Sequence, residues 1–224
     1  MTQNILQSSF QLSGKGIHTG VPCTVSVHPG APGSGYVFTR MDCPEATPMK
    51  LTPDSVTDTD RRTTLSNGTT TVHTAEHLLS ALYAAKIYDV DVHLTAGEVP
   101  ILDGSAAPWW DAIHAAGIAQ STVIPHGITL YHPIRVEDPE TGAWAEAIPA
   151  ALPSFEVKLS HEEAAVGPLS AFYHLKDDYG NTIAPARTFT LASHITPLIH
   201  RGLLKGAEPG SGVIVIDAPL KDED

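Results

Sequence analysis

The residues best suited to chemistry are Glu76 and His77, a carboxylate and an imidazole that are neighbours in sequence. They lie in a segment whose apolar residues recur at helical spacing. Successive side chains on a helix point about 100° apart, so one can bind a metal ion while the other reaches a water on that ion. A zinc ion lowers the pKa of its water, and a carboxylate can accept the proton as the water attacks a carbonyl. The pair therefore predicts metal-assisted hydrolysis.

A second histidine, His73, lies four residues before His77. If the helix extends back this far, both rings share one face and both are candidate metal ligands. The spacing His73-x-x-Glu76-His77 is also that of the inverzincin proteases. Because the chain has twelve histidines, this match is unspecific. The alternative is an ordinary polar helix face.

A loop at Asp103, Gly104 and Ser105 is the next candidate, since it is stiffened by Pro100 before it and Pro108 after it. Glycine allows backbone angles that other residues avoid, which suits a ligand-binding loop. The alternative is a strand-to-helix connection in which Asp103 or Ser105 caps the following helix.

Two further short runs contain candidate binding residues. Arg187 and Thr188 precede Phe189 at the predicted start of a helix, where N–H groups and a threonine hydroxyl stabilise negative charge. Thr188 as an ordinary helix cap is the alternative there. His18 lies in a turn between Gly16 and Gly20, which by itself indicates a hairpin.

The elements that must position these residues alternate in type along the first half. Strands are predicted at 9–13, 24–29, 36–40, 63–65, 69–72 and 88–94 from alternation and turn residues. Helices are predicted at 74–86, which has an apolar face, and at 109–116, which follows Pro108 and ends at Gly117.

The second half is predicted to be rich in strands, with one helix. The expected strands are 127–131, 134–136, 143–147, 155–159, 170–175 and 213–216, and the helix is 189–203. We therefore predict two α+β domains, 1–122 with Glu76–His77 and 123–224 with Arg187–Thr188–Phe189.

Composition excludes several classes of protein. The 224 residues are 42% hydrophobic and 17% charged, which is typical of a globular chain. A net charge of −12 argues against a nucleic-acid partner. No apolar stretch is long enough to span a membrane, and because the N-terminal residues have no basic region followed by a long apolar run, we expect no signal peptide. With only two cysteines, Cys23 and Cys43, the sequence favours a cytoplasmic location.

Taken together, these runs resemble one family, the zinc-dependent UDP-3-O-acyl-N-acetylglucosamine deacetylases of lipid A biosynthesis. The resemblance covers essentially the whole chain, and its most specific motif is Pro-Ile-Leu-Asp-Gly-Ser-Ala-Ala-Pro. The matching stretches are 16–20, 74–79, 98–108, 186–189 and 201–203. This match displaces the protease interpretation.

The resemblance implies two similar domains of β-sheet and helices in a two-layer sandwich, with the site between them. It implies that Glu76 is the general base, that His77 binds zinc and that Thr188 stabilises the oxyanion. Phe189 would line the place where acyl chain and sugar meet. Arg187, Asp103 and His18 would support binding of the UDP-linked acylated amino sugar.

The family's other zinc ligands, a His and an Asp on a later helix, follow the strand that 213–216 matches, and a general-acid histidine comes after them. The chain stops at Asp224. We therefore expect a second domain that is incomplete at its C-terminus, with weak or absent zinc binding unless His73 or other ligands contribute.

Three functional hypotheses follow, so whether the chain is an enzyme stays open. The first is an active deacetylase that takes metal ligands from elsewhere. The second is a catalytically silent relative that binds or regulates. The third is a truncated chain whose incomplete second domain exposes apolar surface and drives formation of a homo-oligomer.

Overall fold

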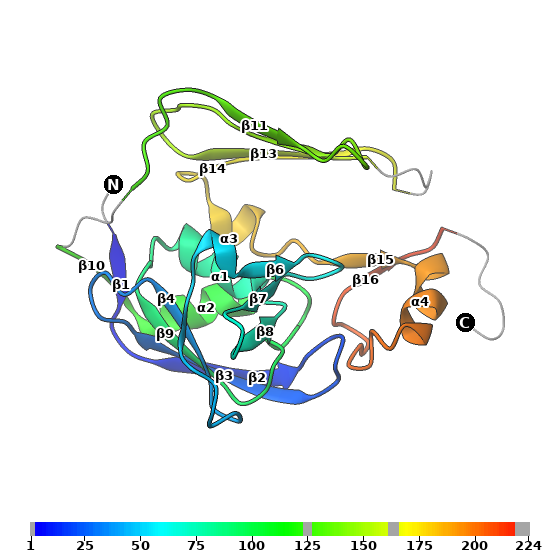
Figure 1. The fold of residues 1–224 in the computed structure, drawn as a ribbon, viewed down its shortest axis with the longest axis horizontal. Helices are drawn as coiled ribbons and strands as arrows, with labels where there is room; N and C mark the ends of the chain where they lie inside the picture. Colours follow the sequence, from blue (N-terminus) through cyan, green and yellow to red (C-terminus); the bar gives the residue numbers. More distant parts are fainter. Residues whose placement is uncertain (1–2, 123–126, 161–165, 218–224) are drawn as a thin grey trace.

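The structure is a computed structural model, and it describes residues 3–122, 127–160 and 166–217. Its helices pack against several small sheets in an α+β fold, which confirms the predicted fold class (Figure 1). The division into domains 1–122 and 123–224 stays a prediction.

A five-stranded sheet forms the base of the first half, in the order β2-β3-β9-β4-β5. Only the β4–β9 pair is parallel among its neighbours. Every second residue of β3 and β9 is buried, as their alternating sequences predict. The strands are β2 (Phe10–Lys15), β3 (Pro22–Pro29), β4 (Tyr36–Arg40), β5 (Met49–Lys50) and β9 (Val90–Leu94).

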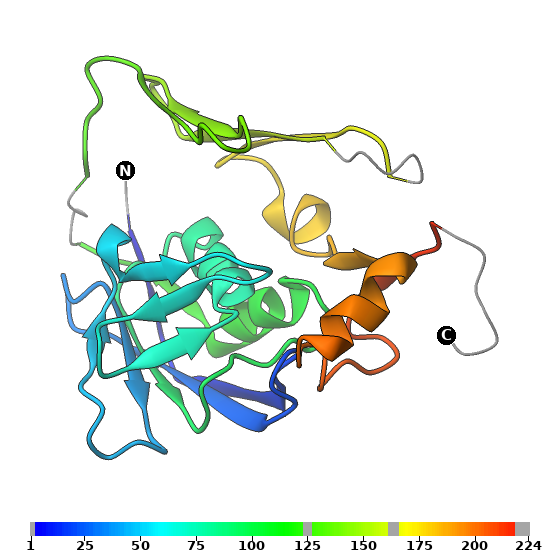
Figure 2. The same cartoon turned by 45° about the vertical axis from the view of Figure 1, so that its right-hand side comes forward.

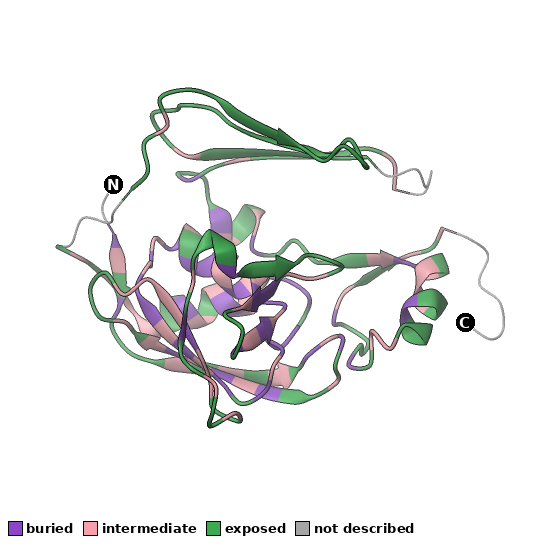
Figure 3. Ribbon diagram, viewed as in Figure 1, coloured by how far each residue is buried: buried purple, intermediate pink, exposed green. Residues whose placement is uncertain are grey.

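Two helices, α1 (Glu76–Ala84) and α2 (Ala107–Ala116), cover one face of this sheet. Leu78 and Leu82 of α1 and Trp109 of α2 are completely buried in the core that they share with the sheet. Figure 3 shows this concentration of buried residues in the first half. No helix in the part of the chain described by the structure is long and apolar enough to cross a membrane.

Smaller elements complete the first half. An antiparallel three-stranded sheet contains β6 (Val56–Asp58), β7 (Thr64–Ser66) and β8 (Thr71–His73), and it follows a short 3-10 helix (Pro53–Ser55). Strand β1 (Asn4–Leu6) pairs antiparallel with β10 (Ile118–Gln120), which brings residues near 120 back to the N-terminal strand.

Two antiparallel hairpins begin the second half, and Figures 1 and 2 place both on the same side of the molecule. The first joins β11 (Ile134–Glu137) to β12 (Trp144–Ala147), and the second joins β13 (Ser154–Leu159) to β14 (Leu169–His174). Almost all their residues are exposed (Figure 3). The strand predicted at 127–131 is wrong, because these residues form no strand.

The short helix α3 (Tyr179–Thr182) then packs onto the first half. Tyr179 is buried in the first half's core, and its hydroxyl lies 2.7 Å from the hydroxyl of Ser80 on α1. The two halves are therefore joined through packed side chains as well as through loops.

The last elements are β15 (Phe189–Leu191), α4 (Ala192–His200) and β16 (Val213–Val215). The predicted helix over 189–203 is wrong at its start, because residues 189–191 pair in parallel with β16. This pairing joins segments more than twenty residues apart, which local apolar spacing cannot reveal.

Candidate active site

Glu76 and His77 occupy the first turn of α1, as the sequence predicts. No side chain caps this helix; Ala75 is its N-cap residue, and a carboxylate in the first turn is favoured by the helix dipole. One oxygen of Glu76 also accepts a hydrogen bond from the N–H of Thr63, at 3.3 Å. The carboxylate is therefore tied to the loop before β7.

The environment of His77 favours its neutral form. Burial lowers the pKa of the imidazole, while the nearby carboxylates of Glu76 and Asp103 and a hydrogen bond to the backbone of Ser105 raise it by less. A neutral imidazole has a nitrogen lone pair free for a metal ion or a proton. His77 thus has the protonation state that a ligand needs, with the 103–105 loop beside it.

The Asp103–Ser105 loop is held by its own side chains. One oxygen of Asp103 accepts hydrogen bonds from the Ser105 N–H at 3.0 Å and from the Ser105 hydroxyl at 2.8 Å. The Ser105 hydroxyl oxygen in turn accepts the N–H of Ala107, the first residue of α2, at 3.1 Å. The loop thus serves as the helix start that the sequence left open as an alternative, although Ala106 is the N-cap residue.

The second half reaches this loop through Arg187 and Thr188. The Nε of Arg187 donates to the carbonyl of Asp103 at 2.7 Å, and its guanidinium also donates to the carbonyl of Gly210. The Thr188 N–H donates to the carbonyl of Gly104 at 2.8 Å. Thr188 precedes β15 and is not the N-cap of α4, which is Leu191, so its expected place at a helix start is wrong.

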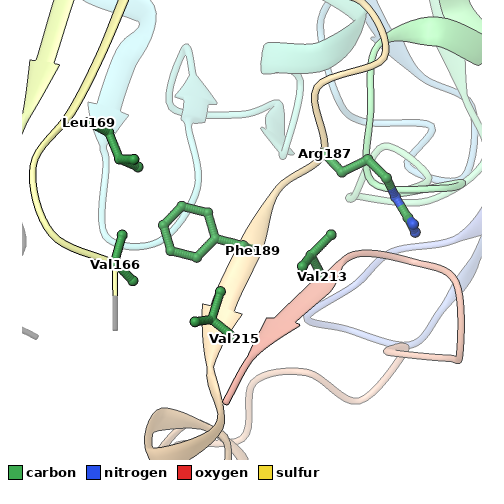
Figure 4. Close-up of a pocket in the computed structure, with 6 residues that line it drawn as sticks. All are labelled: Val166, Leu169, Arg187, Phe189, Val213 and Val215. Atoms are coloured by element: carbon green, nitrogen blue, oxygen red, sulfur yellow. The ribbon is translucent and has the colours of Figure 1, made fainter. Parts of the chain in front are cut away.

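Phe189 lines an open, largely apolar pocket of about 530 Å³ (Figure 4). Its ring lies among aliphatic side chains from β14, β16 and the loop before β14. The residues that line the pocket are Val166, Leu169, Arg187, Phe189, Val213 and Val215. Arg187 and Phe189, on either side of Thr188 in the sequence, both line this pocket.

His18 lies in the loop that joins β2 to β3, which confirms the predicted hairpin. Its side chain is buried, and burial lowers the pKa of the ring against the opposing effect of Glu98, while Arg62 lowers it further. The backbone of Arg61 opposes this lowering of the pKa slightly. Within the residues that the structure describes, the Nδ1 atom of this ring is buried without a hydrogen-bond partner.

His73 does not share a helix face with His77, so that expectation is wrong. It belongs to strand β8, and its Nδ1 lies 3.1 Å from the hydroxyl of Thr64. The following residue, Thr74, has a φ of 60°, which turns the chain before α1 begins. A metal-binding role for His73 therefore loses the geometric argument that suggested it.

The described side chains do not by themselves fit a structural or catalytic zinc site. Over residues 3–122, 127–160 and 166–217, no three His, Cys, Asp or Glu side chains are grouped so that they could hold a metal ion. Glu76 and Asp103 influence the charge of His77 but do not complete such a group. Catalytic zinc normally takes three protein ligands.

One buried carboxylate near the site, Glu98, was not singled out from the sequence. It is 1% exposed and accepts hydrogen bonds from the N–H groups of His18 and Thr19 and from the hydroxyl of Thr74. The available signal was a single charge directly before an apolar, proline-containing run. A charge in such a place is buried only when it is hydrogen-bonded.

The geometry and the comparisons with known proteins now identify the class. The family model "LpxC: UDP-3-O-acyl N-acetylglycosamine deacetylase" matches residues 3–223. The chain belongs to this family, as the sequence resemblance predicted.

Individual relatives agree with the family match. The chain is 31% identical over 223 residues to the UDP-3-O-acyl-N-acetylglucosamine deacetylase of Thioalkalivibrio sulfidiphilus, covering 99% of the chain and 73% of that protein. It is 31% identical over 221 residues to the bifunctional enzyme LpxC/FabZ of Chlorobaculum tepidum, covering 98% of the chain and 47% of that enzyme. The chain thus spans about half the length of the bifunctional relatives.

Proposed function

We propose that this protein hydrolyses the N-acetyl group of a UDP-linked 3-O-acyl-N-acetylglucosamine, a reaction of lipid A biosynthesis. The observation that carries the proposal is the family match across residues 3–223, with His77 next to the Asp103–Ser105 loop that Arg187 and Thr188 of the second half contact. The reaction breaks the amide C–N bond and adds the elements of water, giving acetate and a free amine.

In this proposal Glu76 is the general base. Its carboxylate accepts a proton from the water that attacks the acetyl carbonyl, which a carboxylate near a substrate amide can do. The Thr188 hydroxyl donates a hydrogen bond to the oxygen that becomes negatively charged in the tetrahedral intermediate. That Glu76 and Thr188 act on the same substrate is supported by the hydrogen bond from the Thr188 N–H to the carbonyl of Gly104, which holds the threonine at the loop beside His77.

Zinc is proposed as the cofactor because of the family, with His77 as a ligand. Since the described side chains do not form a three-donor group, we derive no step through the metal. His73 lies on β8 and not on α1, so it does not join His77 in this proposal.

Substrate binding is proposed at the second half of the site. The apolar pocket beside Phe189 suits an acyl chain, since removing apolar surface from water is favourable. Arg187 is proposed to act mainly by joining the Asp103 and Gly210 segments, which its guanidinium contacts. Asp103 and His18 are proposed to shape the sugar side of the site.

The test is acetate release from a UDP-linked 3-O-acyl-N-acetylglucosamine by the protein with added zinc. We expect Glu76→Gln to lower the rate roughly 100-fold or more. Glu156→Gln is the matched control, because Glu156 is an exposed carboxylate on β13. The proposal fails if the wild-type protein releases no acetate, or if both variants retain the same rate.

A second candidate function is a relative that binds the sugar nucleotide without hydrolysing it. The observation in its favour is the incomplete donor set among the described side chains. It predicts substrate binding by calorimetry without acetate release, less than one zinc per chain by elemental analysis, and no effect of Glu76→Gln. Acetate release that depends on Glu76 would exclude it.

A cytoplasmic location and self-association are also proposed. Cys23 and Cys43 are both free thiols, which suits a reducing compartment. Phe155, Val157 and Leu159 on β13 are each about half exposed, and an apolar face of this kind favours association of copies. Cell fractionation and light scattering test the two proposals, and a purely monomeric protein at micromolar concentration would contradict the second.

A further inference from the structure

The Gly16–Gly20 turn, the start of α1 and the segment after β9 meet at one buried carboxylate, that of Glu98. Its side chain is 1% exposed, so the charged group has almost no access to water. One oxygen accepts the His18 N–H and the Thr74 hydroxyl, both at 3.0 Å, and the other accepts the Thr19 N–H at 2.7 Å. All three donors are neutral groups, so among the described residues hydrogen bonds and not an ion pair hold this charge in place.

The turn around His18 is fitted to the carboxylate. A Cβ atom on Gly16 would lie 2.6 Å from the carboxyl carbon of Glu98 and 2.8 Å from its Cβ. Real side chains do not approach so closely, so only glycine leaves room for the carboxylate at this position. The N–H groups of His18 and Thr19 can then both point at the same carboxylate, which fixes the backbone that carries the His18 ring.

On the opposite side, Glu98 holds a strained residue just before the helix. Thr74 has a φ of 60°, a conformation that is rare for a β-branched side chain. Its hydroxyl donates to Glu98, and its N–H donates to the carbonyl of Thr63 at 3.0 Å. Since α1 begins two residues later without a side-chain cap, Thr74 sets where Glu76 and His77 start.

The backbone around Glu98 strengthens the link. The His73 N–H donates to the carbonyl of Gly97 at 2.8 Å, and the Val99 N–H donates to the carbonyl of His73 at 3.0 Å. Glu98 therefore sits in a two-sided junction, with the His18 turn on one side and the entry to α1 on the other. The loop that follows it leads to Asp103 and Ser105, next to His77.

We propose that Glu98 is a positioning residue of the deacetylase site. Its buried carboxylate holds the His18 turn and the start of α1 at a fixed position relative to each other, and this places Glu76 against the substrate. This inference rests on the proposed function for its kinetic part. Its structural part, the position of the His18 ring, is independent of catalysis.

The test compares Glu98→Gln with Asp89→Asn. Asp89 is a matched control because it is also buried, at 4% exposure, and also accepts backbone N–H groups, from Gly33 and Gly35. It lies directly before β9, at the opposite end of that strand from Glu98. Gln in place of Glu98 keeps the shape of the side chain, but its NH₂ group is a donor and would face a donor N–H or hydroxyl. At least one of the hydrogen bonds to Glu98 is then lost.

Two readouts separate positioning from general destabilisation. The first is kcat and KM for acetate release, and the second is the set of ¹H–¹⁵N signals from the His18 ring and from the amides of His18 and Thr19. We expect Glu98→Gln to lower kcat roughly tenfold to a hundredfold with KM within about twofold, and to shift the His18 signals. Asp89→Asn should lower the melting temperature and leave kcat and these signals unchanged.

The outcomes are distinguishable from failure of the proposed function. If the wild-type protein releases no acetate, the function fails, while the His18 signals still decide the positioning inference. If Glu98→Gln does not fold, Thr74→Val takes its place, because it removes only the hydroxyl hydrogen bond to Glu98 and should also shift the His18 signals. Thr74→Ser keeps the hydroxyl and should give the wild-type signals. The inference is overturned if Glu98→Gln leaves kcat and the signals unchanged, or changes them no more than Asp89→Asn does.

Discussion

Replacing Gly104 with alanine tests the contact between the two halves at the site. Gly104 has a φ of 82°, and an added Cβ would lie 2.6 Å from the carbonyl oxygen of Ser211 and 3.0 Å from the Cα of Gly212. Both neighbours are backbone atoms, so neither can rotate away. The 210–212 segment would have to move off the 103–105 loop.

The magnitude follows from two separate costs. Alanine in the left-handed region costs about 1 kcal/mol. Overpacking against backbone adds about 1–3 kcal/mol, so we expect Gly104→Ala to lower the free energy of unfolding by about 2–4 kcal/mol. For a chain of this size that corresponds to a fall in melting temperature of roughly 4–16 °C.

Gly68→Ala is the control, because Gly68 has a φ of 93° and no atom of the described residues lies within 4 Å of the added Cβ. It should cost only the conformational part, about 1 kcal/mol. Urea denaturation of the two variants, followed by circular dichroism, gives the difference between them. If Gly104→Ala costs no more than Gly68→Ala, the 103–105 loop does not approach Ser211 as the structure has it, and the reasoning about this junction is refuted.

Three further predictions concern stability. The free energy of unfolding should fall as the pH drops below the ordinary histidine value of 6.5, because burial lowers the pKa of His18, His73 and His77 and the unfolded chain therefore binds protons first. Urea denaturation at several pH values checks this, and a combined His18→Gln and His73→Gln variant that keeps the full pH dependence would contradict it. Leu82→Ala should cost about 2–5 kcal/mol, since Leu82 is completely buried, and a calorimetric loss below about 1 kcal/mol would show that the core beneath α1 is not packed as described. Ser105→Ala should cost about 1 kcal/mol by denaturation, because it leaves the Ala107 N–H without its acceptor; an unchanged stability would argue against that hydrogen bond.

Much of the first half could be predicted from local pattern. Strands β3 and β9 alternate strictly in sequence because one face of each is buried, and this period of two is visible in any short window. Helices α1 and α2 show an apolar stripe, and Gly117 ends α2 as predicted. Patterns of this kind are local, so no knowledge of the fold is needed to find them.

The misplaced elements depend on contacts between distant segments. Residues 189–191 look helical in isolation, but pairing with β16 makes them a strand, and this moves Thr188 away from a helix start. His73 was misplaced because Thr74, a residue in the left-handed conformation, turns the chain between β8 and α1. Neither the pairing nor the backbone reversal has a signal in the spacing of apolar residues.

The candidate site was predictable in its residues and only partly in its arrangement. The Glu76–His77 pair, the Asp103 loop and the Arg187–Thr188 segment could all be named, and hydrogen bonds and charge interactions do bring them together. Glu98 was missed because a single glutamate looks like surface until the glycine turn that encloses it is known. Burial of a charge depends on tertiary structure, which composition does not report.

The most direct test of the central claim is to run the reaction in H₂¹⁸O and analyse the acetate by mass spectrometry. If water activated near Glu76 attacks the acetyl carbonyl, the acetate formed in a single turnover carries one ¹⁸O atom, and Glu76→Gln greatly reduces its amount. Acetate without the label, or a yield that does not depend on Glu76, would contradict the account.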